Sequence, residues 1–297
     1  MAGRGVKDSE NDDPRYLTTR EVANLLRVKE RKVYDLAAAE EIPHRRITGK
    51  LLFPANEIES WIEGNGQPAG RDRPNVLAGS HDPLLDWAIR ASGCGIATLC
   101  NGSRDGLEKF TAGDAALAGI HLPEEGDWNI ASVSALPLTN AVLVAWAERR
   151  RGLLVAQESA AEIHSLADLK GRRVALRQPG AGTSVLFSQL VSEAGLAEDD
   201  FRCSDGPAHT ESDAAAAVAA GEAEATLGLE AMARQFKLAF VPLRQEKFDL
   251  LIDRKSYFKE PVQTLFAFAR TQHFRDKAAS LGGYALDDTG TVRWLSA

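Results

Sequence analysis

Three short turns rich in glycine and hydroxyl residues are the parts of this sequence best suited to hold a ligand. They lie at 79–83, 101–107 and 177–184, each where a strand-like segment gives way to a helix-like one. Such turns expose backbone N–H groups at the positive end of a helix dipole, and hydroxyls add further donors. Together they would form a cage of neutral donors for a small anion. The alternative for any one turn is that its glycines only permit a tight reversal.

The sequence lacks the patterns of common catalytic and metal sites. No Gly-Lys-Ser/Thr follows the glycines, so a P-loop is excluded, and there is no Gly-x-Ser-x-Gly elbow or Cys/His constellation. His81, His121 and His209 match no ligand spacing, and we interpret them as turn-stabilising. The cysteines at 94, 100 and 203 are expected to be buried free thiols in a reducing compartment. We therefore expect a binding protein with no metal or cofactor, not an enzyme.

Charge is distributed unevenly along the 297 residues. The net charge is −7, yet residues 15–53 hold nine Lys or Arg against five Asp or Glu, a balance of +4 that leaves −11 on the rest. A basic module on an acidic body suits a protein that docks on phosphates at one end only. No stretch approaches the roughly 20 apolar residues of a membrane span. The first 15 residues lack the apolar core of a secretory signal, so we expect a disordered tail and a cytoplasmic location.

The basic segment has the pattern of two short helices. Thr18 and Glu21 have the spacing of a capping box, and Val22, Leu25 and Leu26 follow at helical spacing. A tight connection leads to a second helix over about 29–39, with an apolar side at 33, 36 and 37. The run Arg149, Arg150 and Arg151 elsewhere in the chain is interpreted as a solvated face or a contact between lobes.

Two short helices joined by a tight turn could form a plain helical hairpin or a helix-turn-helix whose second helix enters the major groove. The residues that follow the two helices favour the helix-turn-helix. Residues 44–53 have the pattern of a β-hairpin whose turn is Thr48-Gly49-Lys50, and a third helix is expected at 56–62. The segment 16–63 resembles the excisionase-type, MerR-like winged helix-turn-helix family. The resemblance implies that Arg31, Lys32 and Tyr34 face double-stranded DNA from the second helix. It also implies that Arg45, Arg46 and Lys50 reach DNA from the wing.

Some residues in this module would lower its affinity for DNA. Lys29 stands where the family usually has a Ser or Thr cap, and Glu30 and Asp35 would repel phosphate. Affinity would then have to come from two copies, which implies a homodimer on a two-fold site.

Beyond a Gly- and Pro-rich stretch at 64–74, strand-like and helix-like segments alternate. Strands are predicted at 138–146, 152–156, 173–176 and 239–243, and helices at 184–194, 212–220 and 230–236. This alternation is typical of an α/β fold with largely parallel sheets. We expect a tail at 1–15, a winged helix-turn-helix domain at 16–64, a linker at 65–75 and a ligand-binding domain at 76–297.

Motifs spread over 76–252 resemble the cytoplasmic branch of the type II periplasmic-binding-protein superfamily. They include the three turns, Arg150-Arg151-Gly152-Leu153 and Phe240-Val241-Pro242-Leu243. The resemblance implies two α/β lobes with a ligand in the cleft, and relatives that bind molybdate or tungstate. The ligand contacts it implies are Ser80, Ser103, Arg177 and Thr183, followed by Gly182 and Ser184.

These expectations combine into a one-component transcriptional regulator that senses a small anion. Molybdate or tungstate is the preferred ligand, and another small oxyanion or an organic acid is the alternative. A role as enzyme or accessory in molybdenum-cofactor assembly would not need the basic wing. An excisionase-like architectural factor would not need a large α/β domain.

Overall fold

The computed structural model describes residues 16–62, 72–179, 181–204 and 206–296. The expected tail at 1–15 and residues 65–71 of the expected linker lie outside these residues. The chain divides into two compact units between Asp72 and Arg73. Among the described residues, no helix is long and apolar enough to cross a membrane.

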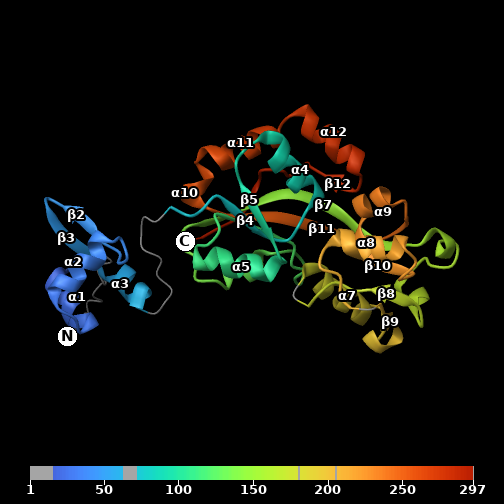
Figure 1. Ribbon diagram of the computed structural model, residues 1–297, viewed down its shortest axis with the longest axis horizontal. Coiled ribbons are helices and arrows are strands. Elements are labelled where there is room, and N and C mark those ends of the chain that lie inside the picture. Colours follow the sequence, from blue (N-terminus) through green and yellow to red (C-terminus); the bar gives the residue numbers. More distant parts are fainter. Residues whose placement is uncertain (1–15, 63–71, 180, 205, 297) are drawn as a thin grey trace, which may run out of the picture. The chain divides into compact units, whose positions relative to one another are not determined.

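The first unit is a small three-stranded sheet with three helices (Figure 1). Its strands are antiparallel in the order β1-β3-β2. In chain order the elements are β1 (Tyr16–Thr18), α1 (Thr19–Leu26), α2 (Glu30–Ala38), β2 (Arg45–Ile47), β3 (Lys50–Pro54) and α3 (Ala55–Ile62).

Local sequence signals account for these elements. The predicted capping box is present, because the Thr18 hydroxyl accepts from the Glu21 N–H at 3.3 Å and the Glu21 carboxylate accepts from the Thr18 N–H at 2.7 Å. Thr48 and Gly49 join β2 to β3 with positive φ angles of 50° and 80°, the geometry that matches the twist of a tight hairpin.

The core of the first unit differs from the prediction at one position. Val22, Val33 and Phe53 are fully buried, but Leu25 is 50 % exposed. The buried stripe of α1 runs through Thr19, Val22 and Ala23, which places Leu25 beside it.

The second unit is built on one ten-stranded sheet, ordered β5-β4-β6-β11-β7-β10-β8-β9, with β12 and β13 also paired to β7. Two strands of 15 residues, β7 (Ala141–Val155) and β11 (Ala239–Asp253), run antiparallel through its centre (Figure 1). The other strands are β4 (Val76–Gly79), β5 (Ala97–Cys100), β6 (Leu117–Ile120), β8 (Arg173–Ala175), β9 (Arg202–Cys203), β10 (Ala225–Leu229), β12 (Tyr284–Ala285) and β13 (Val292–Leu295).

This sheet corrects two expectations. Segments 138–146 and 152–156 contribute to a single strand, β7, because the charged residues between them are also paired in the sheet. The sheet is parallel only toward its two edges, where β5-β4-β6 and β10-β8-β9 lie, and antiparallel at its centre.

Helices cover both faces of the sheet and form two lobes. The first lobe carries α4 (Pro83–Ser92), α5 (Ser103–Ala112), α6 (Ile130–Ser134), α10 (Arg254–Tyr257), α11 (Glu260–Ala269) and α12 (Gln272–Leu281). The second carries α7 (Gly182–Glu193), α8 (Glu211–Ala219) and α9 (Glu230–Phe236). Short 3-10 helices lie at Gln157–Ser159, Leu166–Leu169 and Glu198–Asp200.

Each lobe has its own core. In the first, the buried Trp146 packs edge-on against Phe266 of α11 and Phe274 of α12. In the second, Leu153 packs in an apolar cluster that includes residues of α7, and Leu154 packs in another that includes residues of α9. The two leucines differ because successive side chains of a strand point to opposite faces of the sheet. The protein is therefore mixed α/β, with a small helical module and a two-lobed domain.

Candidate functional site

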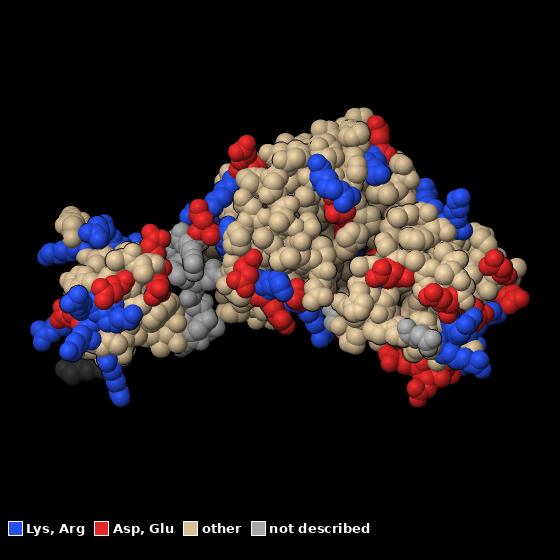
Figure 2. All heavy atoms as spheres, viewed as in Figure 1, with Lys and Arg blue, Asp and Glu red and all other residues tan. Residues whose placement is uncertain are grey.

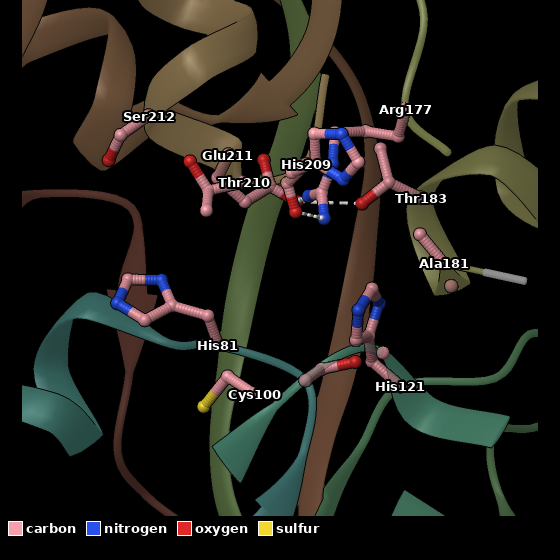
Figure 3. A pocket seen from close by; sticks show the side chains of 13 residues that line it. His81, Cys100, His121, Arg177, Ala181, Thr183, His209, Thr210, Glu211 and Ser212 are labelled. Atoms are coloured by element: carbon pink, nitrogen blue, oxygen red, sulfur yellow. Dashed lines mark hydrogen bonds and ion pairs between the residues drawn. The ribbon is translucent and has the colours of Figure 1, made fainter. Parts of the chain in front are cut away.

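A cavity of about 150 Å³ lies between the two lobes, and we call it cavity 1 (Figure 3). The first lobe contributes residues from the ends of β4, β5 and β6, namely Ser80, His81, Cys100, Gly102 and His121. The second lobe contributes Arg177, Ala181, Gly182, Thr183 and residues 209–212. The three turns singled out in the sequence therefore meet in one place.

Three helices begin at this cavity. Gly102, Ala181 and Thr210 are the residues that precede α5, α7 and α8, and all three line it. Thr210 caps α8 with its own side chain, whereas α5 and α7 have no side-chain cap from their preceding residues within the described chain. The first N–H groups of α5 and α7 therefore carry the partial positive charge of an uncapped helix end toward the cavity.

The predicted serine contacts form a buried pair. The Ser80 and Ser103 hydroxyls lie 2.8 Å apart, and the Ser103 hydroxyl accepts from the backbone N–H of His121 at 3.1 Å. Ser80 lines cavity 1, and Ser103 lies behind it as the first residue of α5. Because Ser103 orients Ser80, the two serines act at the cavity as one unit.

The predicted residues of the second lobe are divided between two cavities. Arg177, Gly182 and Thr183 line cavity 1, whereas Ser184 lines a neighbouring cavity. The Arg177 guanidinium donates to the backbone oxygens of Ala208 and His209 at 3.2 and 2.9 Å. Arg177 is thus already held by the protein at the cavity wall.

Beneath cavity 1 lies a group of buried charges, here called the charge cluster, that the sequence analysis missed. It consists of Asp82, Arg149, Arg151, Glu211 and Glu246. Arg149 and Arg151, expected to lie on a solvated face or at a contact between lobes, are 1 % and 0 % exposed, which excludes the solvated face. They lie two residues apart on β7, so both side chains leave the same face of the sheet. Arg150, on the other face, extends outward.

Contacts within the charge cluster alternate in sign and join the two lobes. Arg149 contacts Asp82 at 2.9 Å and also Glu246. Arg151 contacts Glu246 at 2.8 Å and Glu211 at 2.9 Å. Asp82 precedes α4 of the first lobe and Glu211 begins α8 of the second, so the chain of contacts runs beneath the whole cavity.

The charge cluster keeps Glu211 and Glu246 ionised. Burial alone would raise the pKa of Glu211, but the Arg151 and Arg177 charges and the Thr183 hydroxyl outweigh it and lower that pKa to about 2. Burial is likewise outweighed at Glu246, where Arg149 and Arg151 hold the pKa well below its usual value. A sequence signal for these residues existed in the two arginines spaced for one strand face, between apolar segments.

His121 has a different role from the turn-stabilising one expected of it. Its Nδ1 lies 3.2 Å from a Glu246 carboxylate oxygen, an acceptor, so Nδ1 carries the hydrogen. Burial lowers the pKa of His121, with Glu246 opposing that effect, so the ring is neutral near pH 7. In the described part of the chain, no group of three His, Cys, Asp or Glu residues is placed to hold a metal ion.

Two of the three cysteines also depart from expectation. Cys94 is buried, but Cys100 and Cys203 are exposed. Partial burial, together with Asp86 and Asp82, raises the pKa of Cys100 to about 11, so the thiol at cavity 1 keeps its proton.

The first unit has a groove of about 490 Å³ between the wing and the helices. Tyr34 of α2 lines it together with Arg46 and Lys50 of the wing, and Arg20 of α1 adds a cation. Lys and Arg side chains gather over this unit (Figure 2). Arg31 and Lys32 are exposed on α2. Arg45, one residue before Arg46, faces the other way and pairs with Glu57 of α3 at 2.7 Å.

Known proteins show both parts of this architecture. A family described as a PBP superfamily domain matches residues 87–270, and a helix-turn-helix domain matches 16–66. The uncharacterized protein YvgK of Bacillus subtilis is 24 % identical over 93 % of this chain and 96 % of its own.

Other similarities are more limited. A protein of Clostridium pasteurianum from the 5′ region of a 2Fe-2S ferredoxin gene is 33 % identical over 26 % of this chain and 70 % of its own. A cysteine-to-serine mutant of OxyR from Corynebacterium glutamicum, solved with H2O2 bound, is 14 % identical and covers 89 % of each chain with a TM-score of 0.48.

The PBP match spans more than half of the chain and includes β5, α5 and β6 of the first lobe and the strands and helices of the second. The chain therefore belongs to the PBP superfamily domain family and carries a helix-turn-helix domain at its N-terminal end.

Proposed function

We propose that this protein is a transcriptional regulator, not an enzyme, whose two-lobed domain senses a small anion. The observation that carries the proposal is the meeting of two uncapped helix N-termini, one from each lobe, at cavity 1. An anion there would be attracted by both lobes at once and would hold them together. The domains would be 16–64 and 76–297, joined by a linker at 65–75.

On the DNA side, the contacts we propose are Arg31, Lys32 and Tyr34 of α2 with Arg46 and Lys50 of the wing. Their exposure and the shared groove support this assignment. We leave Arg45 out of the proposed DNA contacts because its guanidinium is paired with Glu57. Glu30 also lines the groove and would repel phosphate, so one module would bind DNA weakly. The proposal therefore has two copies acting on one two-fold site, and it places the protein in the cytoplasm.

On the ligand side, the proposal covers a small anion held by the Ser80 hydroxyl and the backbone N–H groups of Gly182 and Thr183, with Ser103 orienting Ser80 and Arg177 lining the cavity. The volume of about 150 Å³ is below the roughly 300–1,000 Å³ typical of drug-sized ligands, so the bound group is small. Molybdate and tungstate are the ligands implied by the resemblance. A small organic acid is the alternative.

Thermal shift and DNA binding test the proposal together. Purified full-length protein is melted with molybdate, tungstate, sulfate, phosphate and small carboxylates, and the active anions are added to binding assays on DNA from its own promoter. We expect at least one anion to stabilise the protein and to change its DNA affinity. Absence of both effects for every anion would overturn the sensor.

A pair of serine variants locates the site. Ser80→Ala removes a hydroxyl from the cavity wall and should weaken the affinity for the active anion about tenfold or more, the value of one hydrogen bond to a charged group. Ser192→Ala removes an exposed hydroxyl near the far end of α7 and should leave the affinity unchanged. Equal affinities in the two variants would place the anion elsewhere.

A further inference from the structure

A second and larger cavity adjoins the first in the second lobe. This cavity 2 has a volume of about 410 Å³, within the range typical of small-molecule sites. Among the described residues, its apolar lining comes from α7, the strand ends and the turns beside them, with Leu176, Pro179, Phe187, Pro207 and Leu227. Ser184 and Ser188 of α7 also line it, together with Glu198, which accepts a hydrogen bond from Ser188 at 2.6 Å.

The two cavities have a common wall. Arg177 and Thr183 line both of them. Thr183 directs its hydroxyl to Glu211 at 2.7 Å and accepts from Arg151 at 3.0 Å, which fixes its orientation at the boundary. The start of α7 therefore borders both cavities, so cavity 2 adjoins the place where an anion at this helix end would bind.

The side-chain charges around cavity 1 are balanced. Three cations, Arg149, Arg151 and Arg177, are matched by three acids, Asp82, Glu211 and Glu246, in one connected set of contacts. The positive potential available to an anion therefore comes from the N-terminal ends of the helices that begin at the cavity.

We infer that the ligand is an organic anion with an apolar part, whose anionic group binds in cavity 1 and whose apolar part extends into cavity 2. This inference rests on the proposed function and names its ligand class. It assigns Ser184, expected to contact the anion, to the apolar part of the ligand instead. The apolar part of such a ligand would fill cavity 2, which an inorganic oxyanion in cavity 1 would leave empty.

Ligand length is the variable that tests this inference. Full-length protein is titrated by calorimetry with acetate, butanoate, hexanoate and benzoate, and with molybdate, tungstate and sulfate. Each methylene that enters cavity 2 should tighten binding about fourfold until the cavity is filled. Hexanamide, with the same chain and no charge, should bind far more weakly than hexanoate. Affinity that does not change with chain length would overturn the inference.

Blocking cavity 2 should separate the two parts of the ligand. Ser184→Phe places a ring in cavity 2 and should abolish the dependence on chain length while acetate affinity is kept. Ser192→Phe, on the same helix but not lining cavity 2, is the matched control and should behave as the wild type. If Ser184→Phe fails to fold, Ser188→Phe at an exposed lining position makes the same test.

Failure of this inference is distinguishable from failure of the sensor. Oxyanion binding that is lost in Ser80→Ala, with no effect of chain length on the carboxylates, would overturn the organic ligand and leave an anion sensor. Absence of binding by any anion in the series, with DNA binding intact, would overturn both. Unchanged chain-length dependence in a folded Ser184→Phe or Ser188→Phe variant would contradict cavity 2 as the site of the apolar part.

Discussion

Arginine side chains have different roles in the two units of this protein. Arg31 and Arg46 of the first unit are exposed, where water solvates a charge and DNA phosphates can approach it. Arg149 and Arg151 of the second unit are buried, and each contacts two carboxylates. A buried charge persists only with partners, because leaving water costs several kcal/mol. Exposed arginines should therefore control binding, and buried ones the stability of the folded domain.

The strongest test of this contrast is Glu246→Ala. Removal of this carboxylate takes away the partner shared by Arg149 and Arg151 in the interior. We expect a loss of about 3–5 kcal/mol in unfolding free energy, the usual result of breaking a buried pair. Denaturant unfolding followed by tryptophan fluorescence measures it.

Arg150→Ala is the matched control, since this side chain is 53 % exposed and pairs with Glu230. It should cost under about 1 kcal/mol. Similar losses in the two variants would show that burial does not distinguish these positions.

Asp249 is a buried acid whose polar neighbours do not fully offset the cost of its burial. Burial raises its pKa to about 6 from 3.8, although Asn129 donates to it at 2.7 Å and Arg293 pairs with it. The folded state therefore favours the protonated form and loses stability as pH rises from about 4 through 6. Asp249→Asn should raise unfolding free energy by roughly 1–3 kcal/mol at pH 8 and have little effect near pH 4. Melting curves across pH measure this, and a gain independent of pH would refute the assignment.

On the exposed side of the comparison, Arg31→Ala should weaken DNA binding by about 1–3 kcal/mol, and Lys50→Ala should lower the salt slope by about one. Neither should change stability by more than about 0.5 kcal/mol. Fluorescence anisotropy at several salt concentrations measures both. Arg45→Ala is the control, because that side chain faces Glu57, and it should keep DNA affinity. A loss of affinity as large as that of Arg31→Ala would return Arg45 to the DNA interface.

The smallest expected effects concern the helix caps of the first unit. Thr18→Ala removes the side-chain cap of α1 and should cost about 1 kcal/mol. Lys29 precedes α2 in an extended conformation and forms no side-chain cap with the described residues, so Lys29→Ser should add stability of up to about 1 kcal/mol. Thermal melts of the two variants should shift in opposite directions.

Features encoded by neighbouring residues could be predicted from the sequence. The capping box at Thr18 and Glu21 and the helix-strand order depend on positions a few residues apart. The same holds for the turns that place Ser80 and Thr183 at cavity 1, because a glycine-rich strand-to-helix turn carries its own signal.

Features that depend on distant partners could not be predicted. The partner of Arg149 is Glu246, 97 positions along the chain, so the spacing of the arginines indicates a shared strand face but not the acid that pairs with them. Cavity 2 arises from how α7 packs over the strand ends, which local patterns do not describe. Leu25 shows the same limit on a smaller scale, since periodicity alone does not locate the edge of a buried stripe.

The crossing of β7 and β11 between the lobes also sets the order in which the domain can be completed on the ribosome. The paired strands of the second lobe lie between residues 151 and 244. The sheet of the first lobe begins at Val76, yet β6 pairs with 249–252 and β7 with 292–295. During synthesis from the N-terminus, the later-coded lobe can therefore close first, and the earlier one must wait for residues 292–295.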